Sequence, residues 1–398
     1  MTCSSTSGGS LGGRQLLRFL TPALLLSMGN IWIVTDLHAS SAVTNSTAHQ
    51  VEEYLWLPSL IPEPLAQPTD ATHHFPREPR PRPPLESIVQ GWNVSGDASW
   101  LLNVAVIGFP KCGTSTLMQH LESHPEVQMF TKERCELSGR QEATLIRDLY
   151  RQMPAGDFVR GIKCPLDIDS TTMFLPAYQK YFPKAHFIVG VRHPVLWFES
   201  FYNFRVHNGF PMPPANKCIG ACSKGVFNAC TDRSNFHFFL GNLGKTNTSD
   251  PEEIKLIPPR WRRKRTVVDL PQKVFLYELS QLSDTNETRE EWFLRDLQNF
   301  LHLRQAIPPM IWIRPGKNLT TDLKEQRDAR KIDICDTGHN VLRHRLMENS
   351  LAASEWIERY FMKAKDVVVS NTNHFHELME RWKADPCVER RANRIGSE

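Results

Sequence analysis

The first chemistry-bearing stretch of the chain is the run VAVIGFPKCGTSTLMQHLESHP, from Val104 to Pro125. Its pattern indicates a buried strand, a glycine-bounded turn and the start of a helix. The main-chain N–H groups at such a helix N-terminus point toward an anion. Lys111 adds a positive charge inside the turn, and hydroxyl residues open the helix: Thr114, Ser115 and Thr116. The run predicts a phosphate site; the alternative is an ordinary strand–turn–helix with a solvated lysine.

The position of the lysine narrows the class of ligand. An ATP-type P-loop, GxxxxGK[ST], has its lysine after the second glycine, whereas here Lys111 precedes Gly113, with Cys112 between them as an expected free thiol. A nucleotide hydrolase also needs an acidic residue at a strand end to help hold magnesium. The strand AHFIVGV is followed instead by Arg192, whose guanidinium suits a phosphate directly. Nucleotide hydrolysis is therefore disfavoured.

These two motifs resemble those of sulfotransferases that use 3′-phosphoadenosine 5′-phosphosulfate (PAPS). The loop resembles their 5′-phosphosulfate loop. VGVRHPVLWFESFYN resembles their 3′-phosphate motif, because Ser200 follows Arg192 by eight residues. The resemblance implies that PAPS is the co-substrate, that no metal is required, and that the donor is held by Lys111, Cys112, Gly113, Thr114, Ser115, Thr116, Arg192 and Ser200.

Within that family the chain looks most like the Golgi carbohydrate sulfotransferases, especially the branch that sulfates heparan sulfate on oxygen or nitrogen. In that branch a catalytic glutamate follows HP(D/E)V at a fixed distance, and HPEVQMFTKE places Glu133 six residues beyond Val127. The branch's EKTP-like lysine matches Lys163 in GIKCP. The resemblance implies that Glu133 takes the acceptor's proton, while Lys111 and Lys163 stabilise the leaving phosphate and the sulfuryl group.

Simpler interpretations of these residues stay open. Glu133 could be a surface partner of Lys132 or Arg134, and Lys163 an ordinary lysine at a strand end. Cytosolic sulfotransferases use a histidine base, for which this chain has no clear counterpart. If Glu133 is not the base, His193 and Glu136 are the nearest substitutes.

Two basic segments lie further along the chain. In the family a basic loop closes over the 3′-phosphate, and RPGKN lies where that loop would fall; its lysine–glycine order is reversed, which leaves the roles of Arg314 and Lys317 open. RWRRKR, from Arg260 to Arg265, could contact an acidic polysaccharide. It could also be a solvated loop or an R-x-K-R processing site.

The elements that would position these residues alternate between strand and helix. This order predicts an α/β fold with a mostly parallel sheet flanked by helices, and a P-loop-like strand–loop–helix that binds PAPS. Strands are expected at 103–109, 158–165, 185–191 and 273–279, and helices at 114–123, 194–206, 289–303 and, as one helix or a pair, 340–361.

The N-terminal part has a different composition. Residues 1–18 are expected to be a cytosolic tail and the apolar run 19–34 a signal-anchor, with a cleaved signal peptide as the alternative. Residues 35–99, rich in Pro and Ser, are expected to be a stem, 100–390 the sulfotransferase domain, and 391–398 a tail. The expected location is the Golgi membrane in a single-pass type II topology, or else secretion.

Composition supports a secretory-pathway protein that does not bind nucleic acid. The net charge of +4 over 398 residues is mild, so a basic site has to be local. Five N-x-[ST] sequons favour a glycoprotein: Asn45, Asn93, Asn247, Asn286 and Asn318. Eight of the nine cysteines follow the apolar run, where disulfides persist.

Cysteine spacing suggests disulfides more than metal ligands. Cys218, Cys222 and Cys230 could ligate zinc, but their spacing is irregular and no histidine completes the set, which favours disulfides in an inserted loop. Cys335 and Cys387 bracket the C-terminal helices and are candidates for a pair.

The sequence as a whole predicts a Golgi sulfotransferase acting on a hydroxyl or amine of a carbohydrate. The alternatives are sulfation of a protein tyrosine or a small lipid or sterol alcohol, and a non-catalytic protein of the same fold that binds a nucleotide or glycan.

Overall fold

The computed structural model describes residues 75–222, 229–246, 250–257, 259, 270–311 and 321–395, all within one compact unit that starts at Thr69. The predicted anchor at 19–34, the basic run at 260–265, and Arg314 and Lys317 lie outside the described residues. No helix in the described ranges is long and apolar enough to cross a membrane.

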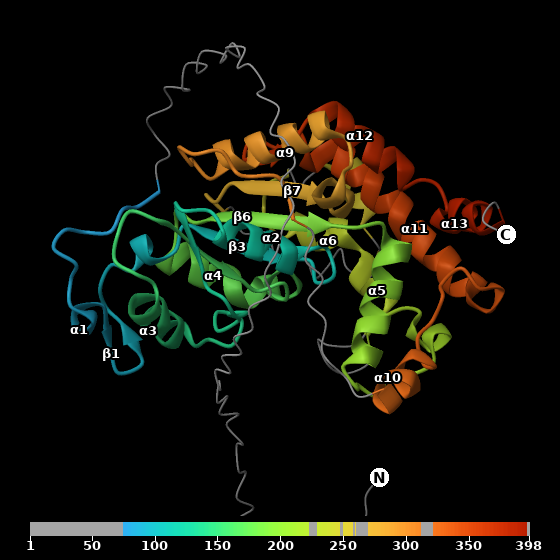
Figure 1. The fold of residues 1–398 in the computed structure, drawn as a ribbon, viewed down its shortest axis with the longest axis horizontal. Helices are drawn as coiled ribbons and strands as arrows, with labels where there is room; N and C mark the ends of the chain where they lie inside the picture. Colours follow the sequence, from blue (N-terminus) through green and yellow to red (C-terminus); the bar gives the residue numbers. More distant parts are fainter. Residues whose placement is uncertain are drawn as a thin grey trace, which may run out of the picture. The chain divides into compact units, whose positions relative to one another are not determined.

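A six-stranded sheet forms the centre of the fold (Figure 1). All its neighbouring strands are parallel and their order is β4-β5-β3-β6-β7-β8. The bounds are β3 Val104–Gly108, β4 Val127–Met129, β5 Val159–Lys163, β6 His186–Val191, β7 Val274–Glu278 and β8 Val367–Val369. The predicted mostly parallel sheet is confirmed. Because the strands are parallel, the segments that follow β3, β5 and β6 emerge at the same edge.

Both faces of the sheet are covered, which explains why its central strands are apolar throughout. Val104 and Val106 of β3 pack in one cluster with side chains of α2 (Thr114–Glu122) and α9 (Glu287–Phe300). Ala105 and Ile107, which point the opposite way, belong to a larger cluster with α4 (Thr171–Tyr181), α5 (Pro194–His207) and α11 (Asn340–Trp356). The helices on both faces confirm the predicted α/β architecture.

The remaining helices complete the domain. The α-helices are α1 Leu85–Ile88, α3 Glu142–Gln152, α6 Phe236–Gly241, α7 Pro251–Leu256, α10 Thr321–Asp328, α12 Thr372–Arg381 and α13 Pro386–Ile395. The 3-10 turns are η1 Ser99–Leu101, η2 Asp167–Ser170, η3 Ala215–Cys218, η4 Thr231–Ser234, η5 Leu279–Ser283 and η6 Thr337–His339. A π-helical turn, η7 Ile357–Phe361, extends α11, so the expected segment 340–361 is one helix with an altered last turn.

The predicted domain boundary at residue 99 is wrong for the part of the stem that the structure describes. Residues 75–99 contain α1 and the antiparallel pair β1 Val89–Gln90 and β2 Asn93–Val94. Arg82 Nη2 donates to the Tyr150 carbonyl at 2.8 Å, and its guanidinium lies over the rings of Trp100 and Tyr150. Arg82, which the sequence placed in a spacer, therefore packs against aromatic side chains of the domain.

Three disulfides join six of the described cysteines: Cys135–Cys164, Cys222–Cys230 and Cys335–Cys387. The expected pairing of Cys335 with Cys387 is confirmed, as are disulfide formation in the 218–230 loop and the free thiol of Cys112. Cys218 is also free and buried, and burial raises the pKa of its thiol to about 11. The Cys135–Cys164 pair was not anticipated.

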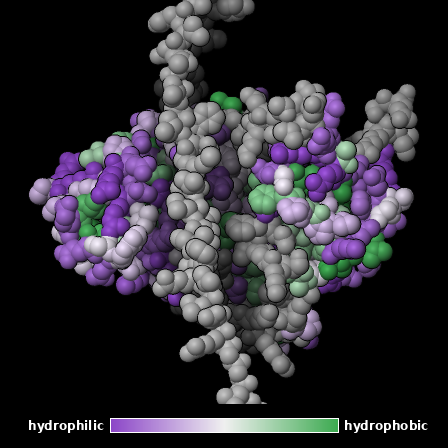
Figure 2. Space-filling model, turned by 90° about the horizontal axis from the view of Figure 1, so that it is seen from below, coloured by the Kyte–Doolittle hydropathy of each residue, from purple (hydrophilic) through white to green (hydrophobic). Residues whose placement is uncertain are grey.

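The described residues on one face of the domain are largely hydrophilic. Figure 2 shows mainly hydrophilic residues on the face it presents, with small hydrophobic areas between them. Exposed apolar side chains lie in separate segments of the chain, for example Trp92, Ile311, Val341 and Val388. The sequon asparagines Asn93 and Asn286 are both exposed.

The N-terminal extension makes a testable contribution to stability. Arg160 Nη2 lies 2.6 Å from Glu78 Oε2, and the two side chains are only 1% and 7% exposed. Glu78→Gln in the full chain should lower the free energy of unfolding by about 3–5 kcal/mol, because it leaves a buried cation without its partner. Denaturant unfolding measures the change. Glu86→Gln, on the exposed side of α1, is the control; equal stability of the two variants would contradict the structural role of residues 75–99.

Candidate active site

The loop between β3 and α2 lies at the carboxyl edge of the sheet. Gly113 is the N-cap of α2 and has a φ of 77°, in the left-handed region that glycine adopts readily. A glycine N-cap has no side chain to occupy the N–H groups of the first helical turn. The turn therefore offers its main-chain donors and the positive end of the helix dipole to an anion.

Lys111 has an unusual backbone conformation in this loop. Its φ is 68°, which for a residue with a side chain costs on the order of 1–2 kcal/mol. Its Nζ lies 4.4 Å from the centre of the Phe204 ring on α5. Burial lowers the pKa of Lys111, and the positive charge of Arg192 lowers it further. Such strain at a charged loop residue is typical of a binding or catalytic position.

Residues from two other strands and α5 hold the loop in this shape. The Tyr277 hydroxyl at the end of β7 donates to the Cys112 carbonyl at 2.8 Å, and Trp197 Nε1 on α5 donates to the Pro110 carbonyl at 2.8 Å. A side chain at Gly190 in β6 would put its Cβ 2.4 Å from the Tyr277 ring and 2.9 Å from the Cys112 carbonyl oxygen. Sequence analysis missed these supports, although a glycine inside a buried strand is a known sign of close backbone approach.

Three predicted site residues from three separate segments meet beside the loop. Lys163 Nζ, at the end of β5, lies 2.8 Å from Ser115 Oγ on α2 and 2.9 Å from Glu133 Oε1 in the segment after β4. The Lys163 side chain is 4% exposed and that of Glu133 is 54% exposed. A buried ammonium thus connects the phosphate-type loop to a carboxylate that solvent can reach.

The surface-pair interpretation of Glu133 does not match the contacts. Its ion pair in the structure is with Lys163. Arg134 instead pairs with Glu136 at 2.8 Å and with Asp148. Glu136, one of the two substitute bases, is therefore engaged with a buried arginine.

Arg192 lies at the end of β6, next to the loop. Its Nη1 is 3.5 Å from the Lys111 carbonyl oxygen, and burial lowers its pKa. Glu278, at the end of the neighbouring β7, is buried; burial raises its pKa, and Arg192 partly opposes that effect. Ser280 donates both its N–H and its hydroxyl to Glu278. Glu278 is a buried carboxylate near Arg192 that sequence analysis did not identify.

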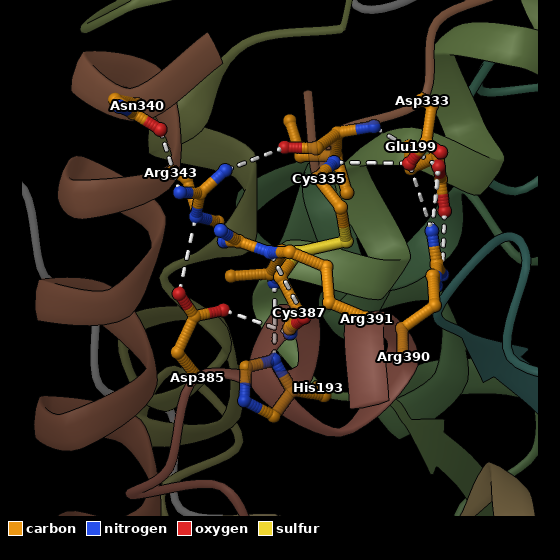
Figure 3. Close-up of a disulfide and its surroundings, with 12 residues drawn as sticks. His193, Glu199, Asp333, Cys335, Asn340, Arg343, Asp385, Cys387, Arg390 and Arg391 are labelled. Atoms are coloured by element: carbon orange, nitrogen blue, oxygen red, sulfur yellow. Dashed lines mark hydrogen bonds and ion pairs between the residues drawn. A yellow bond between two sulfur atoms is a disulfide. The ribbon is translucent and has the colours of Figure 1, made fainter. Parts of the chain in front are cut away.

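The helix that carries Ser200 is anchored by the C-terminal segment (Figure 3). Arg390 of α13 makes two contacts of 3.0 Å with the carboxylate of Glu199, next to Ser200, and a third of 3.2 Å with Asp333. The Cys335–Cys387 disulfide joins the segments that carry Asp333 and Arg390. Ser200 is half-buried.

His193, the other substitute base, has a structural role. Its Nδ1 accepts the N–H of Val195 as the N-cap of α5, and its Nε2 lies 3.2 Å from the Ala384 carbonyl oxygen. The side chain is buried, and burial lowers its pKa to about 4. Both ring nitrogens are thus engaged within the protein, so His193 is not placed to take a proton from an acceptor.

The other predicted loop residues are inside the protein. Cys112, Thr114 and Thr116 are buried. Burial raises the pKa of the Cys112 thiol, which keeps it protonated and unreactive. Cys112 and the two threonines can therefore contribute to a ligand mainly through the main chain, whereas Ser115 contributes its hydroxyl. In the part of the chain that the structure describes, no group of three or more His, Cys, Asp or Glu side chains could hold a metal ion.

Comparisons with known proteins add little to this geometry. No family model and no curated protein matches the chain. Among solved structures, it is similar to a sulfotransferase from Alicyclobacillus acidocaldarius, with 18% sequence identity and a TM-score of 0.37. The match covers 65% of this chain and 96% of that protein. A likeness this distant carries no functional argument, so function has to be argued from the site.

The buried state of His193 predicts how stability depends on pH. Because its folded-state pKa of about 4 is below the ordinary 6.5, its neutral form contributes stability above pH 6.5 that is lost as pH falls toward 4. The loss is about 3 kcal/mol. His193→Asn keeps an N-cap acceptor for α5 and removes the titration, so its stability should fall less over this range. Denaturant unfolding between pH 4 and 7.5 measures both.

The exposed His344 provides the control for that measurement. His344→Asn should keep the pH dependence of the parent. If His193→Asn also keeps the pH dependence of the parent, His193 is not buried in its neutral form.

Proposed function

We propose that this chain is a sulfotransferase that moves a sulfuryl group from PAPS to a hydroxyl or amine of a carbohydrate in the Golgi lumen. The observation that carries the proposal is the meeting of Ser115, Lys163 and Glu133 beside a loop that offers helix N-terminal N–H groups. It combines an anion cradle, a buried cation and an accessible carboxylate.

The charges around the loop suit a ligand with several negative charges. Burial lowers the pKa of both Lys111 and Arg192, and the positive charges of Arg192 and Lys163 lower the pKa of Lys111 further. A multiply charged anion would relieve this repulsion. The residues present therefore fit PAPS: the loop, Lys111 and Ser115 would hold the 5′-phosphosulfate end, and Arg192 with Ser200 the 3′-phosphate.

The arrangement can perform each task that sulfuryl transfer requires. PAPS supplies an activated sulfuryl group whose bond to the phosphate breaks as the acceptor oxygen or nitrogen bonds to sulfur. Glu133, exposed on the acceptor side, takes the proton that the acceptor loses. Lys111 and Lys163 stabilise the negative charge that develops on the leaving phosphate oxygen and the sulfuryl oxygens.

The proposed compartment rests on the chemistry of the chain. Three disulfides among the described cysteines suit an oxidising lumen. Exposed Asn93 and Asn286 suit N-glycosylation there. We propose that residues 19–34 anchor a type II membrane protein, with secretion after cleavage as the alternative, and that residues 260–265 contact an acidic polysaccharide. A tyrosine or lipid acceptor would use the same Glu133 and Lys163.

Donor recognition predicts selective stabilisation by the product nucleotide. Without added metal, 3′-phosphoadenosine 5′-phosphate should raise the melting temperature of the protein more than adenosine 5′-phosphate or ATP, which lack the 3′-phosphate. Ser200→Ala should reduce this advantage and leave the response to adenosine 5′-phosphate unchanged. Thermal unfolding with each nucleotide measures both effects; equal stabilisation by all three nucleotides would refute the roles of Arg192 and Ser200.

The proposed base predicts a split between turnover and binding. Glu133→Gln keeps the side chain's shape but cannot accept a proton, so transfer from PAPS should fall by about 10²–10⁴-fold. Affinity for the product nucleotide, measured by calorimetry, should stay within about threefold because the donor is held by other residues. Lys111→Ala should damage both properties.

Lys132→Ala, at the exposed position next to Glu133, is the control and should keep parental turnover. Turnover of Glu133→Gln above about a tenth of the parent's would remove Glu133 as the base.

A further inference from the structure

The Cys135–Cys164 disulfide lies beside the proposed catalytic pair. Cys164 directly follows Lys163, and Cys135 comes two residues after Glu133. The disulfide joins positions 29 residues apart whose Cα atoms are 5.1 Å apart. It therefore connects the segment that carries the carboxylate to the strand end that carries the cation.

Backbone hydrogen bonds around the disulfide also connect the segment that carries Glu133 to β5. β4 pairs with β5 up to Met129 and Gly161, and the chain then continues alongside β5. The Phe130 N–H donates to the Gly161 carbonyl at 2.8 Å, and the Arg134 N–H donates to the Lys163 carbonyl at 2.9 Å. Glu133 is thus held on both sides, with the disulfide directly beyond the last of these hydrogen bonds.

The ion pair alone would hold Glu133 weakly. Its side chain is 54% exposed, and ion pairs of exposed carboxylates contribute little because water and salt screen them. The neighbouring Arg134 helps to hold this segment, because it is buried against the Phe130 ring and pairs with Glu136 and Asp148. The disulfide is the one covalent link between the described segments that carry Glu133 and Lys163, apart from the chain itself.

We propose that the Cys135–Cys164 disulfide is a positioning element that fixes Glu133 relative to Lys163 for the transfer step. Its catalytic consequence rests on the proposed function. A misplacement of about 1 Å in a reacting group can reduce a rate by about 10²-fold. Without the disulfide, the segment from Phe130 to Cys135 keeps its hydrogen bonds to β5 only part of the time, whereas the donor loop keeps its separate supports from Tyr277 and Trp197.

The test compares two full-length disulfide variants: Cys135→Ser/Cys164→Ser and the matched control Cys222→Ser/Cys230→Ser. The first should lower kcat about 10–100-fold while the acceptor KM and the affinity for 3′-phosphoadenosine 5′-phosphate stay within about threefold. Its peptides that cover residues 130–136 should exchange their amide hydrogens faster than in the parent, by mass spectrometry without any nucleotide. The control should match the parent in kcat and in exchange at these residues.

Each result decides one of the two proposals. Unchanged exchange at residues 130–136 in the first variant, an equal loss of kcat in the control, or a parallel loss of nucleotide affinity would overturn the positioning role. A parent protein that transfers no sulfuryl group and binds no 3′-phosphoadenosine 5′-phosphate would overturn the proposed function. In that case faster exchange at 130–136 would still support the disulfide as the element that holds Glu133 beside Lys163.

Discussion

The site depends on one buried ammonium group, that of Lys163. Its Nζ contacts Ser115 on the loop side and Glu133 on the solvent side, both within 3 Å. A cation with almost no exposure needs partners of this kind, because an uncompensated buried charge is costly. The parallel sheet makes the contact possible, since the ends of β3 and β5 lie side by side. The position of Lys163 thus sets how the loop after β3 and the segment after β4 meet.

A second constraint is the shape of the loop itself. Lys111 and Gly113 both have positive φ angles, and for Lys111 this conformation is unfavourable in isolation. It persists because the rest of the domain determines it: Tyr277 holds the carbonyl of Cys112, and Trp197 holds that of Pro110. Contacts from the sheet and from α5 therefore hold Lys111 in its strained conformation beside the N-terminus of α2.

Sequence reasoning was successful where the signal is local. The β3 loop, the parallel sheet and the ends of β5 and β6 follow from apolar runs bounded by glycine and charge, and they place Lys111, Lys163 and Arg192 at one edge. It failed where the signal is short or depends on tertiary contacts. β4 and β8 have three residues each, too few for a periodic pattern. In the sequence the proline-rich residues 75–99 look like a spacer, because the contact of Arg82 with the Tyr150 ring depends on the tertiary fold.

The residues of the candidate site also divide into those that local sequence signals indicate and those that only tertiary contacts reveal. The spacing argument singled out Glu133, but its contact with Lys163 depends on how β4 pairs with β5, which spacing does not reveal. Tyr277 and Glu278 are ordinary residues of an apolar strand in the sequence, and only the sheet order puts them beside Cys112 and Arg192. Motifs therefore indicate candidate site residues, whereas the side chains that support them become visible only in the fold.

Two disulfides each support a different part of the candidate site. Cys335–Cys387 lies with the Arg390–Glu199 contacts that hold α5, and so with Ser200 and the proposed 3′-phosphate side. Cys135–Cys164 lies with Glu133 and the proposed acceptor side. Each side depends on a contact between segments far apart in sequence: Lys163 with Glu133 on one side, and Glu199 with Arg390 on the other. In an oxidising compartment a covalent link is a direct way to hold such distant segments at a fixed separation, and Cys164 and Cys387 lie close in sequence to the charged residues Lys163 and Arg390.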